Sequence, residues 1–174
     1  MTDPETDPAC AVAHGDVAAP RTERALVAVF TSPVANHLLR YAADLGYRTV
    51  LVEPDGERTD KLQAPDGTIV TSDVPDDLPG ADVVVTDHHR DELGAMLRDA
   101  LARPVRWIGV MGNPRHPAPH VPALRGLGVA DDDIARVHRP IGLNIGSRTP
   151  PEIAIATLAG LLADRAGRPG GFEF

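Results

Sequence analysis

The chain of 174 residues has a single cysteine, few aromatic residues and no long hydrophobic run. Cys10 has no second cysteine to pair with, so disulfide-rich scaffolds and four-cysteine zinc modules are excluded. No apolar stretch approaches the roughly 20 residues that span a bilayer, and the acidic start MTDPETDPAC is unlike an export signal. We therefore expect a cytoplasmic protein with no membrane association.

Positive charge is also scarce. The sequence has 17 basic and 25 acidic residues, which gives a formal net charge of -8 and a pI near 5.2. An acidic surface repels nucleic-acid backbones and anionic membranes, so nucleic acid is not expected as a partner.

The chain divides into a short arm and one domain. Residues 1–23 are acidic, contain proline and lack hydrophobic periodicity, which predicts a flexible arm. Residues 24–174 have the size and patterning of a single domain. Short apolar runs predict strands at 25–30, 48–53, 68–71, 81–86 and 106–111. Helical spacing predicts helices at 34–45, 91–102, near 121, at 131–137 and after 149.

The last helix has the clearest signals. Thr149 can cap it, Pro150 suits its first turn, and Glu152 can return the capping bond. Its expected apolar stripe is Ile153, Ile155, Ala156, Leu158, Ala159 and Leu162. Strands that alternate with helices predict an α/β fold: a doubly wound, mostly parallel sheet of five to six strands with helices on both faces, which is Rossmann-like.

In such sheets, ligands bind beyond the carboxyl ends of the strands, where the strand order reverses. The first such loop, Phe30-Thr-Ser-Pro-Val-Ala35, has no glycine, although a pyrophosphate-binding turn needs G-x-G-x-x-G. Thr31 and Ser32 could still offer hydroxyl and amide groups to an anion. Glu53 stands where a ribose-binding acid is expected, but it could equally be a charged residue that ends a strand.

Further candidates follow the later strands. Gly112, Gly142 and Gly146 permit either close approach of a ligand or a tight turn. Asn113 and Asn144 are polar groups of those turns, and asparagine also tolerates left-handed conformations. Arg115 could neutralise a phosphate or be an ordinary surface arginine. Thr86 and His89 follow the strand at 81–86.

The histidines do not predict a metal site. Prolines 117 and 119 prevent a regular helix between His116 and His120, and no cysteine or carboxylate cluster completes a ligand set. No nucleophile with a base is apparent either. The sequence therefore assigns no metal ligand and no catalytic residue, and it favours a protein that is not an enzyme.

Two segments near the C-terminus carry a family resemblance. Trp107-Ile-Gly-Val-Met-Gly112 and the run HRPIGLNIGSRTPPEIA at 138–154 are similar to the patterns YIGxxGS and HxPIGLxIGxxTPxEIA. These patterns are typical of the Rossmann-like domain of the xanthine dehydrogenase accessory proteins, XdhC and CoxI. Thr86-Asp-His-His89 is similar to the family's Thr-His-x-His segment. The resemblance covers roughly residues 25–168 and is strongest after Arg106.

The resemblance implies a chaperone that binds molybdenum cofactor (molybdopterin) and helps to insert it into a molybdenum hydroxylase such as xanthine dehydrogenase or CO dehydrogenase. On this basis the candidate cofactor-binding residues are Thr31, Ser32, Glu53, Thr86, His89, Gly112, Asn113, Arg115, Gly142, Asn144 and Gly146. The family's cysteine-bearing N-terminal domain has no counterpart here. A cofactor-binding role therefore does not transfer to Cys10, and we expect a homodimer or a partner that carries that domain.

Several positions depart from the family. Thr31, Ser32 and Pro33 replace its loop glycines, Asp87 replaces a histidine, and Asn113 and Asn144 replace a serine and an aspartate. Two alternatives therefore stay open: a degenerate Rossmann-like interaction module without a ligand, and an NAD(P)-dependent oxidoreductase, which the missing glycines disfavour.

Overall fold

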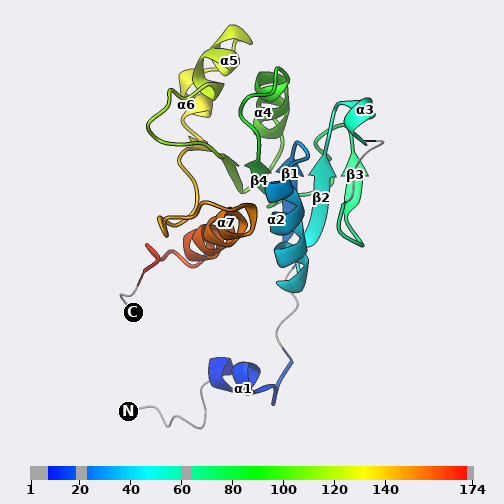
Figure 1. Ribbon diagram of the computed structural model, residues 1–174, viewed down its shortest axis with the longest axis vertical. Coiled ribbons are helices and arrows are strands. Elements are labelled where there is room, and N and C mark those ends of the chain that lie inside the picture. The colour runs from blue at the N-terminus through cyan, green and yellow to red at the C-terminus, as the bar shows by residue number, and fades with distance from the viewer. Residues whose placement is uncertain (1–7, 19–22, 60–63, 172–174) are drawn as a thin grey trace.

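A computed structural model describes residues 8–18, 23–59 and 64–171 of the chain (Figure 1). The elements of the domain are β1 (Ala25–Val29), α2 (Pro33–Asp44), β2 (Arg48–Val52), α3 (Gly56–Thr59), β3 (Ile69–Thr71), β4 (Asp82–Val85), α4 (Leu93–Leu101), β5 (Trp107–Val110), α5 (His120–Gly126), α6 (Asp131–Ile134), β6 (Val137–His138) and α7 (Pro150–Arg165). Across the described ranges, no helix is long and apolar enough to cross a membrane.

Within the described residues, six strands form one sheet in the order β3-β2-β1-β4-β5-β6, and every neighbouring pair is parallel. The chain first winds outward from β1 to β3 and then returns to place β4 on the other side of β1. The strand order therefore reverses between β1 and β4, which is the switch point of a doubly wound sheet. The predicted fold class is confirmed.

Helices cover both faces of this sheet (Figure 1). Residues that alternate along β1 enter separate cores: Val27 and Val29 pack on one face, Leu26 and Ala28 on the other. Residues of α2 and α7 cover the face of Leu26, and residues of α4 and α5 cover the face of Val27. Because the inner strands are buried on both faces, they read as continuous apolar runs in the sequence.

Two local predictions were wrong. The helix expected at 131–137 ends after one turn at Ile134, and Val137 instead begins β6, where its buried side chain packs against the sheet beside β5. The stripe expected on α7 also differs. Ile155 is 53% exposed, whereas Ala154, Thr157 and Leu161 are buried. The helix is apolar on most sides, so periodicity did not select the face that packs.

The described part of the arm contains a short helix that the sequence did not predict. This helix, α1 (Pro8–His14), has no buried residue, and it lies away from the sheet in Figure 1. Cys10 is exposed on it. The helix α1 therefore adds no side chain to the core.

A buried ionic cluster lies at the amino-terminal ends of the strands, which we call the amino edge of the sheet; the carboxyl-terminal ends form the carboxyl edge. Asp82 at the start of β4 is fully buried, and its carboxylate accepts from Arg106 Nε at 2.7 Å and from Arg165 Nε at 2.8 Å. Arg106 also pairs with Asp164 on α7, and Arg165 donates to the Gly80 carbonyl at 3.2 Å. This amino-edge cluster ties α7 to the end of the sheet opposite the switch point.

Candidate functional site

The switch point brings together the loops that follow β1 and β4. Ser32 caps α2: its hydroxyl accepts from the Ala35 amide at 3.0 Å and donates to Thr86 Oγ1 at 3.0 Å. Thr86 Oγ1 in turn donates to the Phe30 carbonyl at 2.8 Å. Two residues predicted for the site, Ser32 and Thr86, therefore contact each other directly, and both hydroxyl groups are used within the protein.

The amides at the start of α2 are largely occupied as well. Thr31 N–H donates to Glu53 Oε2 at 2.9 Å, the Ala35 amide is capped by Ser32, and Pro33 has no N–H. A helix start binds phosphate through free amides that point at the ligand. This turn therefore offers a pyrophosphate few of the donors that it needs.

Phe30 has an unusual backbone at the same turn. In the described part of the chain it is the one residue other than glycine with positive φ, at +72°. That conformation costs an L-residue roughly 1–2 kcal/mol. The ring is fully buried beneath the turn, where a nucleotide-binding loop would have glycine. The burial of the ring compensates for the strained backbone.

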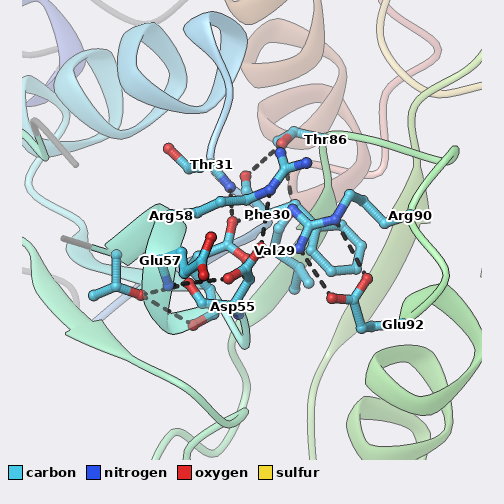
Figure 2. Close-up of polar contacts among 11 residues, drawn as sticks. Val29, Phe30, Thr31, Asp55, Glu57, Arg58, Thr86, Arg90 and Glu92 are labelled. Carbon is cyan, nitrogen blue, oxygen red and sulfur yellow. Dashed lines mark hydrogen bonds and ion pairs between the residues drawn. The ribbon is translucent and has the colours of Figure 1, made fainter. Parts of the chain in front are cut away.

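Glu53, the predicted ribose-binding acid, is 1% exposed and already bound inside the protein. Arg90, from the loop after β4, donates Nη2 to Glu53 Oε1 at 2.9 Å and Nη1 to Oε2 at 3.2 Å. Its guanidinium lies over the Phe30 ring, 4.7 Å from the centroid, and also pairs with Glu92 at 3.1 Å (Figure 2). The hydrogen bonds to Glu53 raise the pKa of Arg90.

The Glu53–Arg90 pair therefore connects the end of β2 with the loop after β4, across the end of β1. Glu53 also accepts from the Asp55 amide at 3.1 Å, so both carboxylate oxygens are engaged. In a dinucleotide-binding domain this acid would bind a ribose hydroxyl. Here Arg90 takes that place.

The loop after β5 is built around a different arginine. Arg139 donates to the carbonyl groups of Asn113 at 2.9 Å and His116 at 3.1 Å. A Cβ on Gly112 would lie 2.8 Å from Arg139 Nε and from its Nη2. The glycine thus makes room for Arg139. Asn113 turns the loop by accepting from the Arg115 amide at 2.9 Å, and the side chain of Arg115 is exposed.

Histidines surround this loop. The rings of His88 and His89 lie 4.0 Å apart between centroids, and the backbone of His89 donates to Asp87 at 2.9 Å. Burial, followed by the charges of His89 and Arg139, lowers the pKa of His88. His120 is only 4% exposed, and its pKa is lowered by burial and then by Arg139. No group of three or more metal-ligating side chains occurs in the described residues.

The loop with Gly142, Asn144 and Gly146 packs against α7. The Leu143 amide donates to the Ala156 carbonyl at 3.0 Å. Gly142 has φ of +84°, and a Cβ there would lie 3.1 Å from the backbone of Ala156. Packing thus accounts for Gly142. Asn144 and Gly146 are exposed.

Sequence reasoning found the loops but missed the side chains that organise them. The structure joins Thr31, Ser32, Glu53 and Thr86 by hydrogen bonds, and it gathers Gly112 and Asn113 around Arg139. Arg90 and Arg139 were not predicted. Arg90 directly follows the segment Thr86-Asp-His-His89, and Arg139 lies inside the run at 138–154, but nothing local shows how far an arginine side chain reaches.

The parallel sheet, with its strand order reversing between β1 and β4, defines a Rossmann-like domain. The chain belongs to the XdhC family, because the model of the XdhC Rossmann domain matches residues 26–161. It is 37% identical over 89 residues to the uncharacterized protein YqeB of Escherichia coli K12, a match that covers 51% of this chain and 16% of YqeB.

A similar solved structure is a xanthine dehydrogenase from Bacillus halodurans, with a TM-score of 0.62 at 23% sequence identity. The match covers 85% of this chain and 47% of the Bacillus chain, so the present chain spans less than half of either relative. At this identity the similarity establishes the fold.

Proposed function

We propose that this protein is an accessory protein of a molybdenum hydroxylase, such as xanthine dehydrogenase or CO dehydrogenase, and that it holds molybdenum cofactor as cargo in the cytoplasm before transfer. Membership of the XdhC family supports this proposal. The observation that carries it is a difference between the two sides of the switch point. On the β1–β2 side, Glu53 and Arg90 neutralise each other in a buried pair. On the β4–β5 side, the hydrogen bonds of Arg139 in the described residues go to carbonyl groups, and its charge acts on His88 and His120.

The residues present suit an anionic cargo better than a reaction. In the described part of the chain, no cluster of metal ligands occurs. Arg139 Nε and His120 Nδ1 are buried without hydrogen-bond partners, and such groups are expected to meet a partner in the functional state. A binding role uses these groups directly.

The same geometry argues against an NAD(P)-dependent oxidoreductase. The ribose would have to displace Arg90 from Glu53, and the pyrophosphate would meet Pro33 and amides that are already bonded. Breaking a buried ion pair typically costs about 3–5 kcal/mol, which would be lost from binding.

The direct test is a titration of the purified protein with molybdenum cofactor released from a molybdenum hydroxylase. We expect molybdenum to co-elute with the protein and to pass to the cofactor-free hydroxylase. Failure of both co-elution and transfer would refute the proposal. NAD and NADP are titrated in parallel, and saturable micromolar binding of either would support the oxidoreductase instead.

A second candidate, an interaction module without a ligand, is favoured by one observation. The buried Phe30 ring and the Arg90 guanidinium above it fill the place where a nucleotide loop would meet its ligand. This candidate predicts that a hydroxylase co-purifies with the protein while no molybdenum is carried. Molybdenum analysis of the isolated complex separates the two candidates, and light scattering shows whether the protein is a homodimer.

A further inference from the structure

Arg139 is unusual among the arginines because its guanidinium is held without a carboxylate. Within the described residues, its hydrogen bonds go to the carbonyl groups of Asn113 and His116. By contrast, Arg90, Arg106 and Arg165 each contact a buried carboxylate that neutralises them. Arg139 therefore keeps its charge available at the carboxyl end of β5, in a protein with net charge -8.

Two buried polar atoms without partners lie at this place. Arg139 Nε and His120 Nδ1 both lack a hydrogen bond, and the residue His120 is 4% exposed. A buried polar group without a hydrogen-bond partner destabilises the folded protein, because it has lost its bonds to water and gained none in return. That penalty is removed when an acceptor reaches the two atoms.

The third member of the cluster is His88, at the end of β4. It forms a hydrogen bond with the backbone of Met111, the residue before Gly112. Burial, and after it the charge of Arg139, lowers the pKa of both His88 and His120. Asp87 acts on His88 in the opposite direction, and Arg139 is the charge that acts on His120. Arg139 is therefore the positively charged group that both histidines share.

We propose that Arg139, His120 and His88 form a binding site for a tetrahedral oxyanion of the phosphate type. Arg139 Nε and the Nδ1–H tautomer of His120 donate to its oxygens, and His88 faces it from the end of β4. Charge-assisted hydrogen bonds of this kind are the strong ones. The oxyanion is either free in solution or the phosphate ester of an organic molecule. This inference depends on the proposed function only for the identity of that molecule.

Gly112 supplies a variant that tests the site while keeping the fold. In Gly112→Ala, the new Cβ would press on the guanidinium, which is the far end of a flexible side chain and can move aside. His120→Phe keeps the buried ring and removes both nitrogen atoms. The matched control is Arg40→Gln, which removes one positive charge from the exposed side of α2.

The probes are inorganic phosphate and phenyl phosphate at constant ionic strength, followed by calorimetry and by the NMR signals of the histidine rings. We expect saturable binding that shifts the His120 and His88 signals. We also expect about tenfold weaker binding or more in Gly112→Ala and His120→Phe, and unchanged binding in Arg40→Gln. Preference for phenyl phosphate identifies an ester as the ligand, and preference for inorganic phosphate identifies a free oxyanion.

The proposal is overturned if neither probe saturates, or if both site variants bind as tightly as the wild type. A purely structural His120 would show itself differently: His120→Phe would then stabilise the protein, by removing an unpaired atom, and leave phosphate affinity unchanged. Because the probes contain no molybdenum cofactor, the outcome is independent of the cofactor titration. If the wild-type protein binds molybdenum cofactor but neither phosphate probe, the oxyanion site is refuted and the proposed function stands.

Discussion

Each edge of the sheet has a buried carboxylate paired with arginine, but the two carboxylates hold different parts of the protein together. At the amino edge, Asp82 is buried between Arg106 and Arg165. Arg106 directly precedes β5, and Arg165 is the last residue of α7. At the carboxyl edge, Glu53 is buried against Arg90, which comes from a loop. Both carboxylates are almost fully enclosed.

The difference lies in what surrounds each carboxylate. The amino-edge cluster joins regular elements and fixes α7 against the sheet. Glu53 instead shapes two loops, by accepting from the amides of Thr31 and Asp55. On the far side of the switch point, Arg139 and His120 retain atoms without partners. The comparison indicates that the amino-edge cluster holds regular elements together, whereas the buried pair at the carboxyl edge shapes loops at the place where ligands bind in this fold.

The largest expected effect is that of Asp82→Asn. Two arginines would lose their buried counter-charge, and we expect a loss of about 3–5 kcal/mol in the free energy of unfolding. Urea denaturation followed by circular dichroism measures it. Asp133→Asn, which breaks a half-exposed pair with Arg136, is the control and should lose under about 1 kcal/mol. Equal losses in Asp82→Asn and Asp133→Asn would show that the buried cluster contributes no more to stability than an exposed ion pair.

Glu53→Gln should have a smaller effect. The amide oxygen can still accept a backbone bond, and Arg90 retains Glu92, so we expect a loss of about 1–3 kcal/mol in the same urea assay. The variant also weakens the contact between the end of β2 and the loop after β4. If its loss exceeded that of Asp82→Asn, the order expected for the two edges would be reversed.

Phe30 allows burial and backbone strain to be separated. Phe30→Ala and Phe30→Gly remove the same ring, but glycine accepts the positive φ without strain. We expect the glycine variant to be more stable than the alanine variant by about 1 kcal/mol. Thermal melting of the pair measures the difference. A more stable alanine variant would mean that the turn relaxes once the ring is gone.

The smallest effect is a pH dependence at the carboxyl edge. The pKa of His120 is lowered in the folded protein, so the unfolded chain takes up a proton below the ordinary value of 6.5 before the folded one does. Stability should therefore fall as the pH is lowered through 6.5, and this contribution should be smaller than the effects above. His120→Phe should flatten the profile, and an identical profile in this variant would exclude His120 as the source.

Most of the fold could be predicted, for reasons visible in single segments. The run Ala25–Val29 is apolar throughout because it is buried on both faces, and Glu152 signals the start of α7, where its side chain accepts from the Thr149 amide at 3.0 Å. β6 was missed because two residues carry no periodicity. The packed face of α7 was wrong at Ile155 because α2 and the Gly142 loop determine which side is covered.

The site was predictable by position and not by contact. Strand ends locate Thr31, Glu53, Thr86 and Gly112 at one edge, because parallel strands end together. The partners of these residues could not be predicted, since Arg90 lies 37 residues from Glu53 along the chain. Whether the candidate residues bind cofactor stays a prediction for the titrations described above.

The sequence by itself determined the alternation of strands and helices, the family and the edge where a ligand is expected, because these depend on local pattern and order. Only the tertiary structure decided which side of the switch point holds a buried ion pair. Long arginine side chains span several elements, and their partners are chosen by distance and charge in three dimensions. That choice placed Arg90 on Glu53 and left Arg139 and His120 with unused donors.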